Sequence, residues 1–380
     1  MKQAIINTTI VMPDHLIPGG TIVIEDGKIV DFGKKINTDG MECYDAKGGY
    51  TGPGLIDIHT HADGEVFFFD DPVRAAKTQL SHGVTGILPT LYFNMTSDEL
   101  IEQAAIIRKA AKSGDADNII GLYMEAPYMN PKFGANKENN PWRDDISKDK
   151  FANLVDNLCD IVRVWCVAPE RDNILEFVEY AKEKNPKVVF SVAHSEAEPT
   201  DIEPLIPYGL KCATHHTNAT GTIQKYPECR SACVDETALY NDEIYTELIC
   251  DKIGIHVQPY ILRLVKKIKG DDRIILISDS FVEHGPIPKE GIYDGADDIN
   301  FDFSGEICGT KFHLDAACHN MMIHTGSSLC QVFKYASTNP ARMLGLTDVG
   351  VVAKGKRANL ITVDAEFNLK NVYLDGKKVK

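Results

Sequence analysis

The hydrophobic pattern at the two ends of the chain differs from the pattern in its middle. Short apolar stretches near each end are bounded by turn residues such as Asp26-Gly27, which is typical of β-hairpins. They span residues 4–11, 21–25 and 28–32 at one end, and residues 360–363 and 371–374 at the other. Neither end is long enough to bury a core alone. The sequence therefore predicts one small β-sandwich domain built from residues 1–50 and 350–380, in preference to two independent flaps.

The middle of the chain, residues 51–349, alternates apolar strand candidates with helical patterns. The strand candidates are residues 54–61, 84–90, 118–125, 161–167, 187–194, 210–215, 245–251 and 273–279. The helical patterns are at 72–82, 97–112, 173–184 and 258–269, followed by 314–325 and 329–337. This alternation predicts the α/β class and a (β/α)8 TIM-like barrel. A doubly wound sheet is the alternative, but no Gly-x-Gly-x-x-Gly follows any strand.

Two local signals refine this prediction. Thr96 and Glu99 have the spacing of a capping box at the start of the helix at 97–112. Residues 283–312 are rich in Gly, Pro and Asp, and they predict a long functional loop after the eighth strand.

Composition narrows the class of partner. The 380 residues are 43% hydrophobic and 25% charged, and the formal net charge of -15 argues against nucleic acid or an anionic membrane as the main partner. A local basic pocket could still hold a small anionic substrate. No apolar run reaches the ~18–20 residues of a membrane span, and the first residues lack the apolar core of a signal peptide. Most of the ten cysteines stand singly in predicted strands or helices, so we expect reduced thiols and a cytoplasmic protein.

Candidate metal ligands end the predicted strands. The first strand ends in His59-Thr60-His61, and both imidazoles project the same way because a strand alternates its side chains between two faces. Later strands end in Glu125, His194, His215 and Asp279. Any one of these could be an ordinary polar residue at the end of a strand. In a closed barrel, however, the C-terminal strand ends converge on one mouth, so the six together predict a site for one or two divalent metal ions.

The pair His215-His216 needs a choice, because neighbouring strand residues point to opposite faces and only one can reach the mouth. We choose His215, which keeps a Thr-His-x-x-Asn frame.

A bound metal ion lowers the pKa of water towards ~7 and polarises a carbonyl. Asp279 is the candidate that takes the water's proton and passes it to a leaving amine. This chemistry suits hydrolysis of an amide, with Zn²⁺ or Fe²⁺ as suitable ions, and no Gly-x-Ser-x-Gly elbow supports a serine hydrolase.

Several motifs resemble the amidohydrolase superfamily and, within it, the N-acetylglucosamine-6-phosphate deacetylase family. The superfamily motif is Pro-Gly-Leu-Ile-Asp-Ile-His-Thr-His at 53–61. The deacetylase motifs are Glu-Ala-Pro-Tyr-Met-Asn-Pro-Lys at 125–132, Ala-His-Ser at 193–195, Thr-His at 214–215 with Asn218-Ala219, and Gly-Ile-His-Val at 254–257. The resemblance covers nearly the whole chain. It implies a homodimeric barrel enzyme that acts on a small amino-sugar phosphate.

The resemblance also implies residue roles. Glu125, His194 and His215 would bind the main metal ion, and His59 and His61 would bind a second ion that some family members lack. Asp279 would be the general base and then the general acid. The implied substrate-binding residues are Asn218, Ala219, Arg230, His256 and Ile307, with Ile307 closing over the acetyl methyl group and Arg230 being the nearest candidate for a phosphate-binding arginine.

Some residues depart from the family pattern. Tyr123 and Ala126 stand where the family has the His and the Gly of His-x-Glu-Gly, and Asn136 replaces a loop histidine. Arg230 lies four residues further from His215 than the family arginine does. The leading prediction is removal of acetate from N-acetylglucosamine 6-phosphate. The alternatives are an amidohydrolase for a different N-acyl amino sugar or cyclic amide, and a non-catalytic metal-dependent binding protein, which the presence of Asp279 disfavours.

Overall fold

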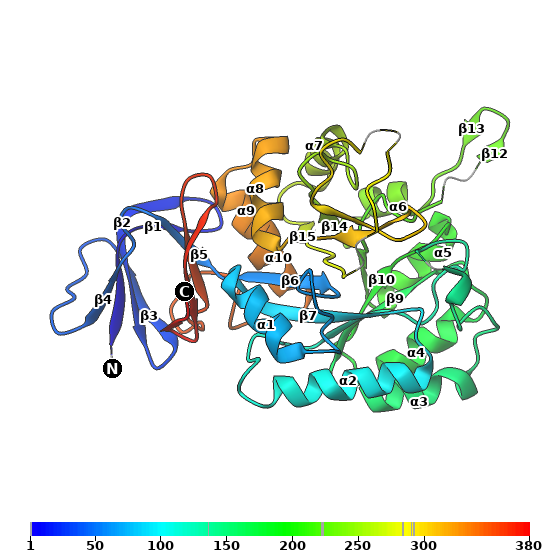
Figure 1. Cartoon of the computed structure of the whole chain (residues 1–380), viewed down its shortest axis with the longest axis horizontal. Coiled ribbons are helices and arrows are strands. Elements are labelled where there is room, and N and C mark those ends of the chain that lie inside the picture. The colour runs from blue at the N-terminus through cyan, green and yellow to red at the C-terminus, as the bar shows by residue number, and fades with distance from the viewer. Residues whose placement is uncertain (1, 136, 222–223, 283–284, 290, 292) are drawn as a thin grey trace.

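The computed structural model describes all residues other than 1, 136, 222–223, 283–284, 290 and 292. Asn136 and part of the predicted 283–312 loop therefore lie outside the described residues. In Figure 1, strands from both chain ends form a sheet on one side of the molecule, and a barrel of strands and helices lies beside it.

The sheet beside the barrel contains strands from both ends of the chain. Its order is β20-β19-β18-β5-β1-β2-β3, and β4 pairs with β1. The strands are Gln3–Val11 (β1), Leu16–Glu25 (β2), Lys28–Gly33 (β3), Glu42–Asp45 (β4), Tyr50–Pro53 (β5), Leu360–Val363 (β18), Leu369–Leu374 (β19) and Lys377–Lys378 (β20). β5 joins the two ends, because it pairs parallel with β1 and antiparallel with β18. The predicted sheet from both chain ends is confirmed, and the alternative of two independent flaps is wrong.

This terminal sheet has a hydrophobic cluster of its own, separate from the main core. Ile5, Ile22 and Ile29 from the N-terminal strands pack there with Leu360 and Tyr373 from the C-terminal strands, and each is at most 1% exposed. Burial of an isoleucine contributes about 1.5–3 kcal/mol relative to exposure. Side chains from both ends therefore stabilise one shared core.

The barrel has eight parallel strands whose order in the sheet follows their order in the chain. They are Leu55–Thr60 (β6), Val84–Tyr92 (β7), Leu122–Glu125 (β8), Val162–Val167 (β9), Val189–Val192 (β10), Leu210–Ala213 (β11), Tyr245–Ile249 (β14) and Ile274–Ile277 (β15). Just beyond β15, the Asp279 N–H donates to the His59 carbonyl (3.0 Å) and the His61 N–H donates to the Ser280 carbonyl (3.0 Å). These bonds bring the last strand back to the first, and the predicted barrel is confirmed.

Helices lie between and around the barrel strands (Figure 1). They are Pro72–Ser81 (α1), Ser97–Ala111 (α2), Lys148–Leu158 (α3), Ile174–Lys184 (α4), Pro199–Ile202 (α5), Val234–Tyr240 (α6), Pro259–Lys269 (α7), Leu314–Thr325 (α8), Leu329–Phe333 (α9) and Asn339–Met343 (α10), with short 3₁₀ turns at Lys137–Asn139 and Glu203–Tyr208. The predicted capping box is present at α2, where the Thr96 N–H donates to Glu99 Oε2 at 2.7 Å.

Three segments differ from the prediction. The expected helix at 329–337 is α9 followed by a π-helical turn, Lys334–Thr338, because Pro340 has no N–H to continue the ordinary ladder. The expected loop at 283–312 contains the hairpin of Ile299–Phe301 (β16) and Ile307–Thr310 (β17). A second hairpin, Gln224–Tyr226 (β12) with Cys229–Arg230 (β13), projects from the barrel in Figure 1. Strands this short carry too few residues for a hydrophobic period to show.

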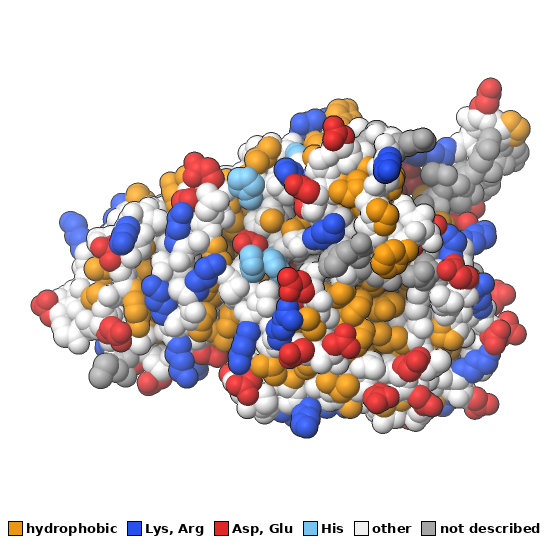
Figure 2. Space-filling model, viewed as in Figure 1, with side chains coloured by type: hydrophobic (Ala, Val, Ile, Leu, Met, Phe, Trp, Pro, Cys, Tyr) orange, Lys and Arg blue, Asp and Glu red, His pale blue; other side chains and the backbone are white. Residues whose placement is uncertain are grey.

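The described helices include none that is long and apolar enough to cross a bilayer. The ten cysteines, all of which lie in the described residues, form no disulfide bond. Figure 2 shows acidic and basic side chains interspersed over one face of the molecule, with hydrophobic side chains gathered in a hollow on the barrel half.

Candidate active site

The first barrel strand presents two candidate ligands to the mouth. All six residues of β6 are buried, and the His-x-His spacing gives His59 and His61 the same direction. His59 is 0% and His61 is 3% exposed. Their ring centroids lie 5.4 Å apart, so the two imidazoles reach one site.

The other four candidates lie at or just beyond the ends of later strands. Glu125 is the last residue of β8, and His194, His215 and Asp279 each lie two residues beyond the ends of β10, β11 and β15. The last three have φ angles of 45°, 28° and 48°. Non-glycine residues rarely adopt this left-handed region, and such strain gathers at functional sites. The tight turn places each side chain in the mouth directly after its strand.

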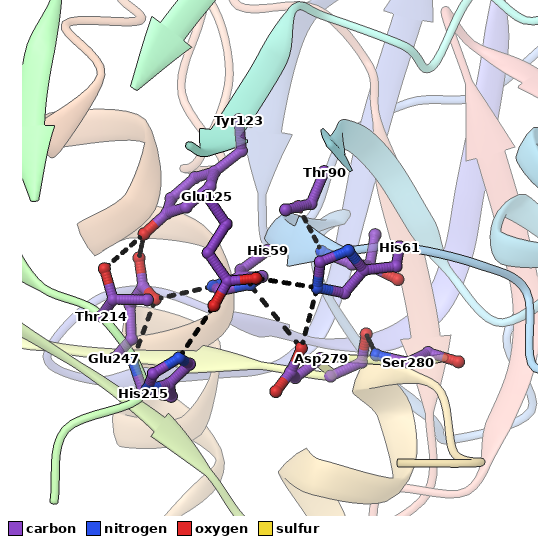
Figure 3. A network of polar contacts seen from close by, with 12 residues as sticks. His59, His61, Thr90, Tyr123, Glu125, Thr214, His215, Glu247, Asp279 and Ser280 are labelled. Atoms are coloured by element: carbon purple, nitrogen blue, oxygen red, sulfur yellow. Dashed lines mark hydrogen bonds and ion pairs between the residues drawn. The ribbon is translucent and has the colours of Figure 1, made fainter. Parts of the chain in front are cut away.

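Glu125 lies between two groups of side chains (Figure 3). Its Oε1 is 2.7 Å from His194 Nε2 and 3.0 Å from His215 Nε2. Its Oε2 is 3.3 Å from His61 Nε2 and 3.8 Å from His59 Nε2. Asp279 completes the second group, with Oδ1 3.3 Å from His61 Nε2 and 3.6 Å from His59 Nε2.

These distances fit metal ligation. Atoms ~2.0–2.1 Å from a tetrahedral ion lie about 3.3 Å from one another, which is close to the spacings in both groups. One group is Glu125, His194 and His215, and the other is His59, His61 and Asp279; within each, the ligand atoms lie within 4.8 Å of one another. Among the described residues, His59 Nε2 is buried, faces two carboxylates and has no hydrogen-bond partner. Each group could therefore hold a divalent ion.

The charges around the site keep its two carboxylates ionised. Burial raises the pKa of Glu125, but the charge of His194 and the hydrogen bonds from the surrounding histidines outweigh it and hold that pKa well below its usual value. Burial also opposes ionisation of Asp279, yet His59 and His61 lower its pKa. Burial lowers the pKa of His194 and so favours the neutral imidazole that a metal ion needs.

Two residues behind the site were missed by the sequence reasoning. Glu247, in β14, is 0% exposed, and its Oε2 lies 3.1 Å from His59 Nδ1. Tyr123, in β8, donates its hydroxyl to Glu247 Oε1 at 2.9 Å. The only signal for Glu247 was an acidic residue inside the apolar run 245–251. Tyr123 departs from the family motif, but a tyrosine in an apolar strand does not by itself indicate a contact with a metal ligand.

The candidate ligands open onto a cavity of about 380 Å³. Four of the five predicted substrate-binding residues line it, namely Asn218, Ala219, His256 and Ile307. Its apolar wall is formed by Tyr92, Phe93, Phe133, Ile249 and Phe281. A cavity of this size is within the range of small-molecule sites.

Arg230 lies away from this cavity. It is on β13 in the projecting hairpin, where its side chain is 66% exposed and pairs with Glu236. The lysine and arginine side chains that line the cavity, among the residues described, are Lys132 and Lys137.

The structure also separates the two adjacent histidines. His215 joins the Glu125 group, whereas His216 is buried outside it, with Nδ1 3.7 Å from Asp235. Burial lowers the pKa of His216 to about 4, so it is a neutral, buried side chain beside α6.

Residues 51–379 match the family model described as Amidohydrolase family. The chain belongs to the amidohydrolase family. The chain is similar to the N-acetylglucosamine-6-phosphate deacetylase of Bacillus subtilis, to which it is 26% identical over 376 residues that cover 94% of this chain and 92% of the relative. The N-acetylgalactosamine-6-phosphate deacetylase of Escherichia coli O157:H7 is also 26% identical, over 86% of each chain.

The fold of this amidohydrolase is shared by a solved structure. An N-acetyl-D-glucosamine-6-phosphate deacetylase variant from Mycobacterium smegmatis, in complex with N-acetyl-D-glucosamine-6-phosphate, superposes with a TM-score of 0.84 at 22% identity. The match covers 100% of this chain and 99% of that one. The barrel and the terminal sheet are thus both part of the common fold.

Proposed function

We propose that this amidohydrolase removes acetate from N-acetylglucosamine 6-phosphate and releases glucosamine 6-phosphate. The observation that carries the proposal is the arrangement of two groups of candidate metal ligands, one containing Glu125 and the other containing Asp279, on a cavity with room for a small molecule. The relatives named as deacetylases of amino-sugar 6-phosphates supply the substrate class.

The residues of the site have complementary roles in this reaction. A bound divalent ion supplies a water molecule of lowered pKa and polarises the amide carbonyl. Asp279, whose pKa is lowered by His59 and His61 against the effect of burial, is ionised and accepts the proton of the attacking water. It then donates that proton to the amine that leaves, which makes it the general base and then the general acid.

The cavity lining suits an acetylated sugar. Ile307 lies in β17 on the cavity wall, and we assign it to the acetyl methyl group. We assign Asn218, Ala219 and His256 to the sugar phosphate. Asp251 Oδ2 lies 3.3 Å from His256 Nδ1, while His256 Nε2 is buried and has no hydrogen-bond partner among the residues that the structure describes. His256 therefore has one ring nitrogen free for a ligand.

A second candidate function is favoured by the position of Arg230. The resemblance assigns this arginine to the phosphate, but its side chain lies outside the cavity lining. Tyr123 and Ala126 also depart from the family motif. The second candidate is hydrolysis of a different N-acyl amino sugar or of a cyclic amide.

Acetate release from purified, metal-loaded protein tests the proposal. The substrates are N-acetylglucosamine 6-phosphate, its galactosamine epimer, and both sugars without phosphate. We expect rapid release from N-acetylglucosamine 6-phosphate and little from the unphosphorylated sugars. Preference for the galactosamine epimer would mean that the substrate is N-acetylgalactosamine 6-phosphate. Equal release from the sugars without phosphate would favour the second candidate. No release from any of the four, in protein shown to hold metal, would contradict the proposed reaction.

The proposal has three further parts. We infer that the ion is Zn²⁺ or Fe²⁺, since histidine and carboxylate ligands suit both. Elemental analysis of protein purified without added metal tests this inference.

We expect a homodimer in solution, and the molar mass measured by light scattering tests this expectation. The lack of disulfide bonds among the ten cysteines supports a reducing compartment. We therefore expect the protein in the cytoplasm, and fractionation of cells tests this location.

A further inference from the structure

Glu247 is an acidic side chain in the barrel interior with no lysine or arginine partner in the described part of the chain. A buried carboxylate is costly unless other groups satisfy its oxygens. Glu247 Oε2 contacts His59 Nδ1 at 3.1 Å and the His215 N–H at 3.3 Å. Oε1 accepts from the Tyr123 hydroxyl at 2.9 Å and lies 3.4 Å from Cys212 Sγ. Four contacts therefore fix this side chain in one position.

The contact with His59 determines which ring nitrogen is available to a metal ion. When Nδ1 carries the proton and donates to Glu247, Nε2 has its lone pair free. Nε2 faces Glu125 Oε2 at 3.8 Å and Asp279 Oδ1 at 3.6 Å. A carboxylate behind a ligating histidine fixes both the tautomer and the ring orientation. Glu247 has this relation to His59.

Tyr123 contacts His59 in two ways. Its ring stacks on the His59 ring, with centroids 4.5 Å apart and an interplanar angle of 26°. Its hydroxyl donates to Glu247 and lies 2.8 Å from Thr214 Oγ1, which is 2.6 Å from Ser191 Oγ. Figure 3 shows Tyr123, Glu247 and His59 in contact behind the site. Tyr123 is also one of the two residues that depart from the His-x-Glu-Gly motif.

The side-chain contacts of this pair are confined to one of the two ligand groups. In the described part of the chain, neither Tyr123 nor Glu247 forms a hydrogen bond with the imidazole of His194 or His215, and His215 Nδ1 lies 3.2 Å from the Asn218 carbonyl instead. Glu247 reaches the other group through the backbone N–H of His215.

We propose that Tyr123 and Glu247 are positioning residues for the ion held by His59, His61 and Asp279, and that they enable this chain to keep a second metal ion. The inference rests on the metal binding of the proposed function. It extends that function by assigning two metal ions to this protein and by naming the residues on which the second one depends.

Metal binding itself provides the test. Tyr123→Phe keeps the stacked ring and removes only the hydroxyl, whereas Glu247→Gln removes the charge and keeps the shape. Zn²⁺ is titrated into metal-free protein against a chromophoric chelator, and bound zinc is counted by elemental analysis. We expect two ions in the wild-type protein and an unchanged affinity for the first ion in both variants. Affinity for the second ion should fall about 10–100-fold in Glu247→Gln, the usual effect of removing such a partner, and by about tenfold in Tyr123→Phe.

Tyr128→Phe is the matched control, because Tyr128 is also buried and its hydroxyl has no hydrogen-bond partner within the described structure. The unfolding midpoint of the metal-free proteins shows whether each variant is folded. One ion in the wild-type protein, unchanged second-ion affinity in both variants, or equal loss of both ions would each overturn the inference and leave deacetylation standing. A wild-type protein that binds no divalent metal would overturn the proposed function as well.

Discussion

Asp279 is the side chain on which the proposed chemistry depends most directly. Replacement by Asn keeps the size of the side chain and removes its ability to accept and return a proton. General acid–base catalysis contributes roughly 10²–10⁴-fold, so kcat for acetate release should fall by about that factor in Asp279→Asn. The group of Glu125, His194 and His215 is untouched, so that variant should still hold the ion of this group.

Asp115→Asn is a suitable control for this comparison. Asp115 is 65% exposed and its nearest cation, Lys77, is 3.8 Å away, so its loss should leave kcat unchanged. Turnover of Asp279→Asn within a few-fold of wild type, with metal content equal by elemental analysis, would exclude Asp279 as the general base.

The sequence was informative about residues that end strands. His59, His61, Glu125, His194, His215 and Asp279 come together because the ends of parallel strands meet at one mouth, and that follows from the fold alone. Glu247 was missed because its oxygens are satisfied by Tyr123 and His59, which are distant in sequence. The position of Arg230 could not be foreseen either, since it depends on a hairpin with no hydrophobic period.

At the scale of elements, long periodic segments were predicted well. The helix α7 begins one residue inside the predicted range 258–269 and ends where predicted, because its apolar residues recur on one face and Gly270 follows its last residue. The hairpins β12–β13 and β16–β17 were not predicted. Their strands contain two to four residues each, and local hydrogen bonds rather than burial alone define them.

The connection between β18 and β19 gives a prediction about stability and pH. Asp364 accepts from the Asn368 N–H at 2.8 Å and pairs with Lys370 at 2.9 Å. Burial opposes its ionisation, but Lys370 and Asn368 lower its pKa to about 2. A depressed folded-state pKa stabilises the protein above the unfolded value of about 3.9. That contribution is lost as the pH falls through about 2.

Asp364→Asn should therefore lower the free energy of unfolding at pH 7 by about 1 kcal/mol. A shift of ~2 pKa units corresponds to about 2.5 kcal/mol, and solvent screening of this partly exposed pair reduces it. The difference between variant and wild type should narrow below pH 4, as measured by urea unfolding. Glu366→Gln, an exposed change in the same turn, should have little effect, and a pH-independent difference for Asp364→Asn would refute the electrostatic explanation.

At the scale of the whole molecule, the candidate ligands connect distant parts of the barrel. They come from or directly follow β6, β8, β10, β11 and β15, so an ion at the mouth links the first strand to the last. An ion that binds only the folded chain stabilises it by about 4 kcal/mol when its free concentration is 1,000 times its dissociation constant. Removal of the metal with a chelator should therefore lower the unfolding midpoint, and added Zn²⁺ should restore it.

The acid dependence of this effect follows from the ligands. Metal binding requires neutral imidazoles and ionised carboxylates, so protons compete with the ion. In the metal-free site, burial opposes protonation of His59, but Asp279 and Glu125 raise its pKa well above the usual value. The stabilisation by metal should thus weaken as the pH falls. Glu125→Ala removes a ligand of one group and a carboxylate that lies 3.3 Å from His61 of the other, so its midpoint should respond much less to the chelator than that of the wild type. An equal response of this variant and the wild type would mean that the stabilising ion binds elsewhere in the protein.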